Sequence, residues 1–325
     1  MRGTQILTRP AYALAMALAS LAAIGVVATP AQAENKDDKK AAPGKAPMPT
    51  KAFIPAYTEL KTVLDAAGKR PDVFAAKATV SQTEQAYRSA RGRAAQAAAR
   101  GAALIAEASA NGADHIELAH LAVRWAHRTF GSLVLMSSMG DEVLVHLATD
   151  AAPGIEVAFI DTGYHFPETL GTAEAYAATR PLRLLTVTPV QTVAAQDAEH
   201  GPQLHGRDPD LCCKMRKVEP LERTLAGRDA WITGMRRVDA PTRSDIEIVG
   251  VDTKRDMVKI NPLALWTEEQ TQDYARNNAV LLNPLRDAGY ASIGCAPCTR
   301  ATAPGEDPRA GRWAGTGKTE CGLHV

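Results

Sequence analysis

The sequence predicts an α/β fold with an open parallel sheet, and this prediction rests on how short apolar segments alternate with helical ones. Four apolar runs have the length and composition of buried strands: residues 133–136, 155–160, 182–187 and 230–233. Helix-forming segments follow or separate them: residues 141–148, 167–179, 190–200 and 214–225. Because parallel strands are joined by crossover helices, this alternation indicates a parallel sheet covered on both faces.

Three further helical patterns flank this alternation. Residues 84–110 are rich in alanine and arginine, and residues 114–130 carry large apolar residues at helical spacing. Residues 262–277 form the last predicted helix, which begins near a Trp-Thr-Glu-Glu stretch. No internal repeat interrupts the pattern, so we assign residues 82–325 to one domain.

The N-terminal part of the chain has a different composition. Residues 1–33 combine a basic start, an apolar run and a small-residue cleavage site after Ala33, which is typical of a secretory signal. A membrane anchor and a non-functional extension are the alternatives. Residues 34–81 begin with a stretch rich in Lys, Asp, Ala and Pro, and prolines and Gly68 then interrupt weak helical patterns. We expect a disordered linker there.

Charge and cysteine content exclude some classes of function. The chain has 37 Lys and Arg against 36 Asp and Glu, a net charge of +1, so nothing attracts it as a whole to nucleic acid or a membrane surface. Its 46% hydrophobic content supports a sizeable core. Five cysteines in 325 residues are too few for a disulfide-stapled fold, and their odd number leaves one thiol over. Clustered cysteines in such a chain favour metal binding and catalysis.

Small and polar residues follow two of the predicted strands, at the sheet edge where parallel sheets bind ligands. Ser137 and Ser138 join the first strand to a helix whose N-terminus favours a phosphate group. Asp161 and Gly163 follow the second strand, where a carboxylate suits a ribose or purine edge and glycine permits close backbone approach. Helix capping by serine and an Asx turn at Asp161 are the structural alternatives. Two such loops at adjacent strand ends favour a nucleotide site.

Four of the cysteines form a set with the spacing of metal ligands. The vicinal pair Cys212 and Cys213 combines with Cys295 and Cys298, which stand two residues apart. Zinc sites favour spaced pairs, so this combination favours a [4Fe–4S] cluster, with zinc and unligated core cysteines as alternatives. Lys217 follows Cys213 by four positions, which suits it to neutralise cluster charge and reach an anionic substrate.

The fifth cysteine and several arginines suggest an anionic substrate. Cys321 lies in a short C-terminal tail, and a thiolate there needs positive neighbours to react at neutral pH. Arg236, Arg309 and Arg312 offer planar guanidinium groups that suit phosphate and sulfate oxygens. Surface solvation explains each arginine singly, and only their combination with a nucleotide-type loop points to a nucleotide anion.

From about residue 88 to the C-terminus, the chain resembles the assimilatory sulfonucleotide reductases, most closely the iron–sulfur adenylyl-sulfate reductases of bacteria and plants. Five stretches carry this resemblance in order: residues 161–169 (DTGYHFPET), 212–221 (CCKMRKVEPL), 230–237 (AWITGMRR), 292–299 (SIGCAPCT) and 320–324 (ECGLH). They span about three quarters of the protein, and the cysteine pattern is the most specific part. Residues 1 to about 80 match nothing in the family.

The resemblance implies a Rossmann-like open parallel sheet of the adenine-nucleotide α-hydrolase-like type, with a Cys-bearing tail. It implies that Cys212, Cys213, Cys295 and Cys298 hold a [4Fe–4S] cluster, which Lys217 links to the substrate. Two arginines would bind the phosphosulfate: Arg309 and Arg312. The nucleotide pocket would comprise Ser137, Ser138, Asp161, Gly163, Gly234 and Arg236. The first loop departs from the Ser-Phe-Ser-Gly pattern of many members, so which of the two serines contacts substrate stays open.

The reaction implied by the resemblance is a two-step reduction. Members that keep all four cluster cysteines generally use adenosine 5′-phosphosulfate (APS), and members without them use the 3′-phosphorylated form (PAPS). Cys321 would attack the sulfur of the phosphosulfate, which releases AMP and leaves an S-sulfocysteine. Thioredoxin or a similar dithiol protein would then release sulfite for sulfate assimilation. The alternatives are a PAPS reductase, an ATP-splitting adenylyltransferase of the same fold, and a non-catalytic four-cysteine metal-binding module.

Two further expectations concern the setting of this reaction. An oxygen-sensitive cluster and a dithiol reductant favour the cytoplasm, whereas residues 1–33 resemble an export signal. A mature protein that begins at Glu34 in a secreted fraction would contradict the cytoplasmic assignment. No nucleic-acid partner is expected, and the sequence leaves the oligomeric state open, with a homo-oligomer as one alternative.

Overall fold

The computed structural model of the chain describes residues 71–316, 318 and 320–323. By their internal contacts these residues belong to two compact units. One unit consists of residues 97–251 and 257 onward and contains nearly all of the sheet. In the other, residues 71–96 of the long helix α3 (Pro71–Ala110) group with residues 252–256, and Arg91 Nε lies 3.4 Å from Asp256 Oδ1.

The sheet has six strands in the order β3-β2-β1-β4-β6-β5. Their bounds are β1 Leu133–Ser137, β2 Ile155–Ile160, β3 Leu182–Val187, β4 Ala230–Ile232, β5 Val249–Asp252 and β6 Met257–Ile260. The first four strands and β6 form parallel pairs with their neighbours, for example Leu135 opposite Val157 and Ala230 opposite Val258. The predicted parallel sheet is therefore confirmed, with every predicted strand in place.

Two strands at one edge were not predicted from the sequence. β5 and β6 are four residues long each and are joined by residues 253–256, a connection too short for a parallel crossover. They form a hairpin that extends the sheet beyond β4. Short strands set among charged residues carry too little apolar periodicity to be recognised by pattern.

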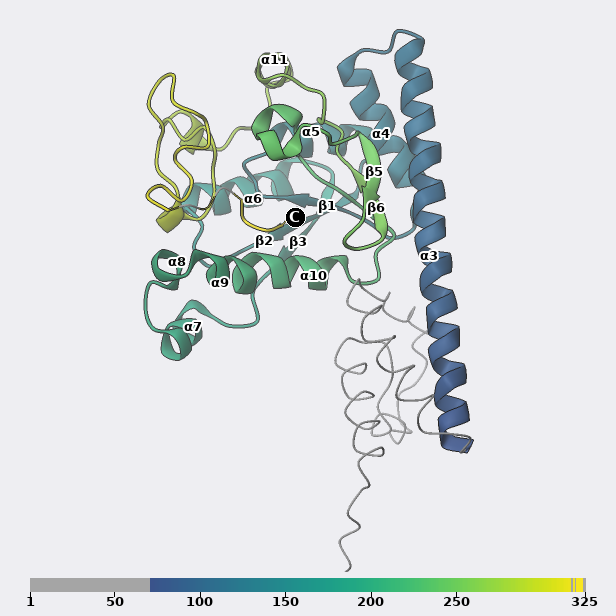
Figure 1. Ribbon diagram of the computed structural model, residues 1–325. Helices are drawn as coiled ribbons and strands as arrows, with labels where there is room; N and C mark the ends of the chain where they lie inside the picture. The colour runs from purple at the N-terminus through teal and green to yellow at the C-terminus, as the bar shows by residue number, and fades with distance from the viewer. Residues whose placement is uncertain (1–70, 317, 319, 324–325) are drawn as a thin grey trace, which may run out of the picture. The chain divides into compact units, whose positions relative to one another are not determined.

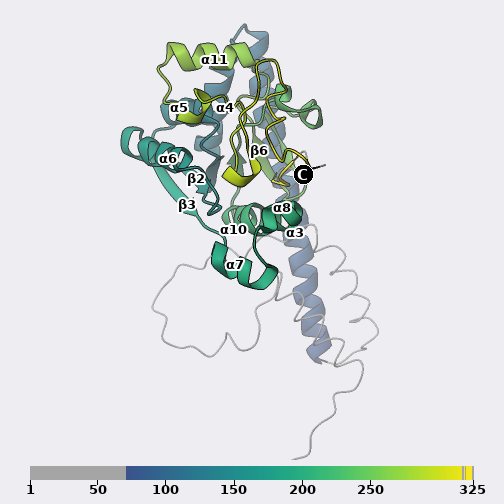
Figure 2. The same ribbon diagram turned by 90° about the vertical axis from the view of Figure 1, so that its left-hand side faces the viewer.

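Helices cover both faces of the sheet (Figures 1 and 2). On one face lie α4 (His115–Thr129), α5 (Glu142–Ala151) and α6 (Pro167–Thr179), with α11 (Glu268–Asn277) on the same side. The other face carries α7 (Val193–His200), α8 (Leu204–Arg207), α9 (Pro209–Cys213) and α10 (Glu219–Leu225). The β1–β2 and β2–β3 connections thus cross one face of the sheet, and the β3–β4 connection crosses the other, as in a doubly covered parallel sheet.

Side-chain caps fix where several helices begin. Asp114 accepts hydrogen bonds from the backbone N–H groups of Ile116 and Glu117, both at 2.8 Å, and so starts α4 one residue later than predicted. Thr267 caps α11 in the same way, so the helix begins at Glu268, within the Trp-Thr-Glu-Glu stretch where its start was predicted.

The helix predicted over residues 214–225 begins with a π-turn. Residues Lys214–Val218 (η2) form this turn between α9 and α10. A π-turn admits one extra residue per turn and changes the direction in which side chains project, and such turns are frequent at functional sites. It follows directly after the Cys212–Cys213 pair and carries Lys217.

The N-terminal boundary of the structured chain differs from the sequence-based expectation. Residues 71–81 were expected to belong to a linker, and the structure has them as the first turns of α3. Pro71 was taken as an interruption, yet proline is well tolerated in the first turn of a helix, where its missing N–H has no partner to lose. The predicted signal at 1–33 and the rest of the predicted linker lie outside the described residues.

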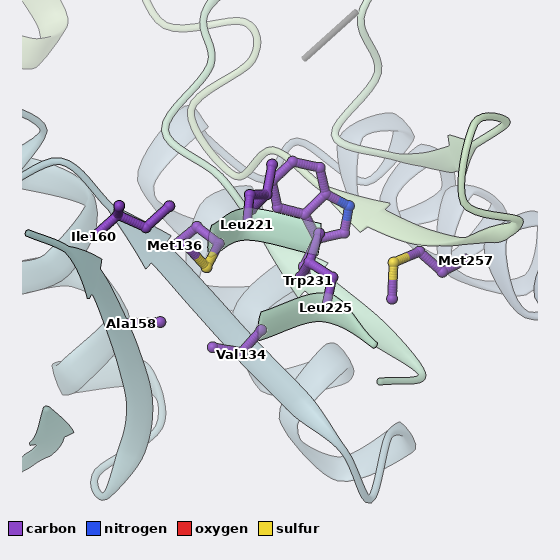
Figure 3. Close-up of a cluster of buried hydrophobic side chains, with 8 residues drawn as sticks. All are labelled: Val134, Met136, Ala158, Ile160, Leu221, Leu225, Trp231 and Met257. Atoms are coloured by element: carbon purple, nitrogen blue, oxygen red, sulfur yellow. The ribbon is translucent and has the colours of Figure 1, made fainter. Parts of the chain in front are cut away.

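A cluster of buried apolar side chains joins the sheet to α10 (Figure 3). Its members come from β1, β2, β4, β6 and α10: Val134, Met136, Ala158, Ile160, Leu221, Leu225, Trp231 and Met257. Each large side chain buried in this way contributes roughly 2–3 kcal/mol to folding. Within the described part of the chain, every helix is too short or too polar to span a bilayer.

Three short 3₁₀ segments frame the edge of the sheet where ligands are expected: η3 (Arg237–Asp239), η4 (Pro241–Arg243) and η6 (Ala296–Cys298). β1 lies between β2 and β4. From β1 the chain adds β2 and β3 on one side, and it then returns to add β4 on the other side of β1. The carboxyl ends of β1 and β4 therefore form the topological switch point.

Candidate active site

A pocket of about 860 Å³ opens at the carboxyl ends of β1, β2 and β4. Most residues predicted for the substrate site line it: Ser137, Ser138, Lys217, Gly234, Arg236, Arg309, Arg312 and Cys321. The structure thus brings together a thiol, a lysine and three arginines from segments far apart in the sequence. The C-terminal segment, yellow in Figure 1, runs back from the periphery to reach this pocket.

The loop after β1 is organised by Asp141, a residue not predicted for the site. Ser137 Oγ donates to Asp141 Oδ1 at 2.6 Å, and Ser138 N–H donates to the same oxygen at 3.1 Å. Ser137 Oγ in turn accepts from Met139 N–H at 3.0 Å. Met139 has a φ of 53°, so the loop turns sharply before α5. Both serines line the pocket, and their hydroxyl groups also belong to this loop network.

Gly234, at the end of β4, is required by the same loop. A Cβ atom built on Gly234 would lie 2.8 Å from Asp141 Oδ2 and 3.0 Å from Asp141 Cβ. Only glycine lets the backbone after β4 come this close to the loop after β1. The predicted contact of Gly234 with the nucleotide stays a prediction.

Burial raises the pKa of Asp141 to about 6, although the hydrogen bond from Ser137 favours the ionised form and opposes the shift. The folded protein therefore binds this proton more tightly than the unfolded chain does. The contribution of Asp141 to stability is complete below about pH 4 and is lost as the pH rises through about 6.

The Asp141→Asn variant is expected to gain stability relative to the wild type as the pH rises from 4 to 7. Asparagine cannot ionise, so it escapes the cost of a buried carboxylate at neutral pH. The relative gain is about 2 kcal/mol, reduced from the full effect because the pocket admits water. Denaturant unfolding of both proteins across this pH range measures the difference. A difference in unfolding free energy that stays constant with pH would contradict the assignment.

The loop after β2 forms a turn of its own beside the pocket. Asp161 Oδ1 accepts from Gly163 N–H at 2.9 Å, which is the Asx turn considered as the alternative, and Gly163 has a φ of +73°. Among the residues that the structure describes, neither of the two lines the pocket, whereas Thr162 and His165 do. Nucleotide contact by Asp161 and Gly163 stays a prediction.

The four predicted ligand cysteines lie together beside the pocket. Cys212 and Cys213 end α9, and Cys295 and Cys298 bracket η6; all four are free thiols, and only Cys298 is half-buried. Burial, followed by the charges of the other three, raises the pKa of the Cys212 thiol to about 12. Thr162 Oγ1 lies 3.3 Å from Cys295 Sγ. The structure thus gathers the four sulfur atoms in one electrostatic environment.

Lys217 connects this cysteine set to the pocket. Its side chain is only 9% exposed, and its ammonium group lies 5.9 Å from the centre of the Trp313 ring. Burial alone would lower the pKa of Lys217, but the thiolate charges of Cys295 and Cys321, with Cys213, outweigh it and raise the pKa. A positive charge is therefore held between the cysteine set and the reactive tail.

Arg309 and Arg312 face the pocket from the C-terminal segment. Arg312 Nη1 donates to Ile293 O at 3.0 Å and to Ser292 Oγ at 3.2 Å. Burial lowers the pKa of Arg312, and a thiolate on Cys321 offsets part of that effect. A Cβ on Gly294 would lie 2.3 Å from Arg312 Nη2, so this glycine makes room for the guanidinium group.

Arg236 also lines the pocket, but acidic groups already engage its guanidinium. It lies 2.8 Å from Asp239 Oδ1 and 2.9 Å from Glu268 Oε2, and it donates to Thr271 Oγ1 at 2.8 Å. A substrate anion bound to Arg236 would therefore have to share the guanidinium group with these three side chains.

The pocket wall also contains residues that were not predicted for the site, among them Asp141, His165, Arg243 and Trp313. His165 Nε2 lies 2.9 Å from Ile160 O, and burial lowers the pKa of its ring. Trp313 is 4% exposed and has a φ of 49°, with the Arg312 guanidinium 4.6 Å from its ring centre. A tryptophan directly after Arg312 was the only local signal available for it.

Comparison with known proteins identifies the family. The model of the phosphoadenosine phosphosulfate reductase domain matches residues 132–301, which is more than half of the chain. The chain is 58% identical to the adenosine 5′-phosphosulfate reductase of Streptomyces coelicolor over 62% of its own length and 86% of that protein. Its identity to the adenosine 5′-phosphosulfate reductase of Mycolicibacterium smegmatis is 51%, over 70% and 93% of the two chains.

A solved structure is also similar in part. A phosphoadenylyl-sulfate reductase from Candida auris shares 31% identity, with 56% of this chain and 90% of that chain covered at a TM-score of 0.49. The family match spans every strand of the sheet and the four cysteines beside the pocket. This chain therefore belongs to the phosphoadenosine phosphosulfate reductase family.

Proposed function

We propose that this protein reduces adenosine 5′-phosphosulfate to sulfite and AMP in sulfate assimilation. Two relatives with this name are 58% and 51% identical to the chain over the aligned residues, which cover 86% and 93% of their length. The observation that carries the proposal is the presence of Cys321, Lys217, Arg309 and Arg312 in one pocket. A nucleophilic thiol among cations suits an anionic sulfur electrophile.

In the first step, the Cys321 thiolate attacks the sulfur atom of the phosphosulfate. An S–S bond forms, the bond between sulfur and the bridging oxygen breaks, and AMP leaves with that oxygen and its electron pair. The product on the protein is S-sulfocysteine. Because the attacking group and the substrate are both negatively charged, the reaction needs cations that offset this repulsion.

The three cationic side chains divide this task. Arg309 and Arg312 offer several N–H donors to the phosphate and sulfonate oxygens, and their planar groups can bind two oxygens at once. Lys217 lines the same pocket as Cys321 and is held positively charged there, so it can offset negative charge on the sulfonate oxygens. The loop after β1 and the backbone at Gly234 would hold the nucleotide at the switch point of the sheet.

In the second step, a thiolate of a dithiol protein, thioredoxin or one like it, attacks Sγ of the modified Cys321. Sulfite leaves with the electron pair of the S–S bond, and a mixed disulfide forms. The second thiol of the partner then displaces Cys321 as a thiolate. The dithiol supplies the two electrons and ends as a disulfide, so Cys321 is regenerated.

The four gathered cysteines fit a [4Fe–4S] cluster, which we propose as the resident cofactor. Four free, largely buried sulfur donors are the ligands that such clusters require. In the part of the chain with described coordinates, no three or more His, Cys, Asp or Glu side chains converge on a single ion. Thiolates that bind the corners of a cluster stand farther apart than the ligands of one zinc ion. When bound, the cluster supplies a fixed local charge distribution beside the pocket.

We place the reaction in the cytoplasm. An oxygen-sensitive iron–sulfur cluster and a reactive thiol are both maintained in a reducing compartment. The same compartment regenerates dithiol proteins, which the second step consumes.

The proposal is tested with the full-length protein purified without oxygen. Incubated with APS and a reduced dithiol protein, it is expected to release sulfite and AMP in equal amounts, and much faster than with PAPS. Sulfite from PAPS alone would favour the 3′-phosphorylated substrate used by relatives without the cluster. Turnover of neither nucleotide would contradict the proposed function and reopen the non-catalytic metal-binding alternative.

A further inference from the structure

The residue that precedes the reactive cysteine is held by two arginines. Arg243 Nη2 donates to Glu320 Oε1 at 3.0 Å and to Oε2 at 3.1 Å, and Arg309 Nη2 donates to Glu320 Oε2 at 3.3 Å. The Glu320 side chain is only 16% exposed, and that of Arg243 only 10%. A partly desolvated pair that involves two oxygens of a carboxylate is among the stronger polar contacts in proteins.

An apolar contact holds the chain on the other side of Cys321. Leu323 packs against the cluster of buried side chains between the sheet and α10. Gly322, between them, has a φ of +82°, and a Cβ there would lie 3.4 Å from Val218 Cγ2. Cys321 is thus fixed from both sides, by a carboxylate one residue before it and an apolar side chain two residues after it.

Arg243 is itself held in place from behind. Its Nη1 donates to Asp239 Oδ2 at 3.3 Å, and Asp239 also accepts from Arg236 Nε at 3.0 Å and from Arg236 N–H at 3.0 Å. Arg243, which binds Glu320, ends the 3₁₀ segment η4, and Asp239, which holds Arg243, ends η3. Both segments follow β4. These segments connect the tail to the switch point of the sheet.

We propose that Glu320 is a positioning residue that docks the Cys321 tail on Arg243 and shares Arg309 with the anionic end of the substrate. This inference rests on the proposed function, because it assigns the substrate anion to Arg309. Arg309 has five N–H donors, but the Glu320 carboxylate and the substrate carry charges of the same sign. Substrate and Glu320 thus compete for Arg309, while Arg243 keeps the tail docked during thiol attack.

The Glu320→Gln variant separates these two effects. Loss of the charge is expected to slow transfer of the sulfonate to Cys321 on the order of 10- to 100-fold, since a charged hydrogen-bonded pair is broken. The same change is expected to lower the Kd for AMP about two- to fivefold, because Arg309 loses a competing carboxylate. Single-turnover mass spectrometry of Cys321 and calorimetric titration with AMP measure the two quantities.

A mutant cycle and two controls complete the test. Arg243→Gln should slow the transfer similarly, and the double variant should be no slower than the slower single variant. Glu320→Asp keeps the charge and is expected to recover most of the rate. Glu306→Gln breaks an exposed pair with Arg300 (2.6 and 3.1 Å) in the same C-terminal segment and should leave the rate unchanged. A wild-type rate in Glu320→Gln, or independent effects in the double variant, would overturn the proposal.

Docking of the tail is also measurable without any substrate. Alkylation of Cys321 by iodoacetamide, followed by peptide mass mapping, should be several-fold faster in Arg243→Gln than in the wild type. Removal of a positive charge by itself slows alkylation, so only release of the tail explains an acceleration. If the wild type transfers no sulfonate from either nucleotide, the proposed function fails, and unchanged or slower alkylation in Arg243→Gln separately overturns docking on Arg243.

Discussion

Replacing Cys321 with serine is expected to abolish sulfite release, with a loss of at least about 1,000-fold. A serine hydroxyl has almost the same size as the thiol but is hardly ionised at neutral pH, so it cannot attack the sulfur of the phosphosulfate. Neither AMP release nor the mass increase of an S-sulfocysteine should be seen after incubation with APS. Anaerobic assays of sulfite and AMP, with intact-protein mass spectrometry, measure all three.

The same variant has a clear set of controls. AMP affinity and protein stability should stay close to wild type, because the residues proposed to bind the nucleotide follow β1 and β4 and are unchanged in this variant. An ATP-splitting adenylyltransferase or a non-catalytic metal-binding module would be nearly insensitive to this change. Sulfite release that persists in Cys321→Ser would therefore contradict the proposed mechanism, in which the Cys321 thiolate attacks the substrate.

Three strands of the sheet, β1, β2 and β4, were predictable because nearly all of their residues are buried. β1 and β2 consist of short apolar runs with helices between them, and such runs arise almost only in doubly covered parallel sheets. The same alternation places Ser137 and Gly234 each at the end of a strand, but only the strand order in the structure makes β1 and β4 neighbours. Asp161 shows the limit of this reasoning, since a residue at a strand end can equally satisfy its own turn.

The contacts that hold the tail were beyond sequence reasoning. Arg243 and Glu320 are 77 residues apart, and neither lies in an element with a periodic pattern. Their pairing depends on how η3 and η4 turn after β4, and on how the C-terminal segment returns to the pocket. The role of Asp141 could not be predicted for a different reason. Its pKa is raised by burial, which depends on the packing of its loop against the backbone at Gly234.

Replacing Cys295 with serine is expected to reduce iron from about four atoms per chain to less than one, together with acid-labile sulfide. Serine oxygen is a hard ligand and replaces a soft thiolate poorly. Cys295 is buried and lies next to Thr162, so water cannot easily take its place as a ligand. Iron and sulfide assays on anaerobically purified protein, with the absorption band near roughly 400 nm, report the loss independently of activity.

Cys321→Ser is the matched control for this change, since it also exchanges one sulfur for oxygen beside the same pocket. If Cys321 stands outside the ligand set, that variant should keep all its iron while losing sulfite release, and Cys295→Ser should lose both. Equal iron in all three proteins would remove Cys295 from the ligand set. Zinc in place of iron in the wild type would break the link between the four cysteines and APS, because that link depends on a cluster and not on the cysteines alone.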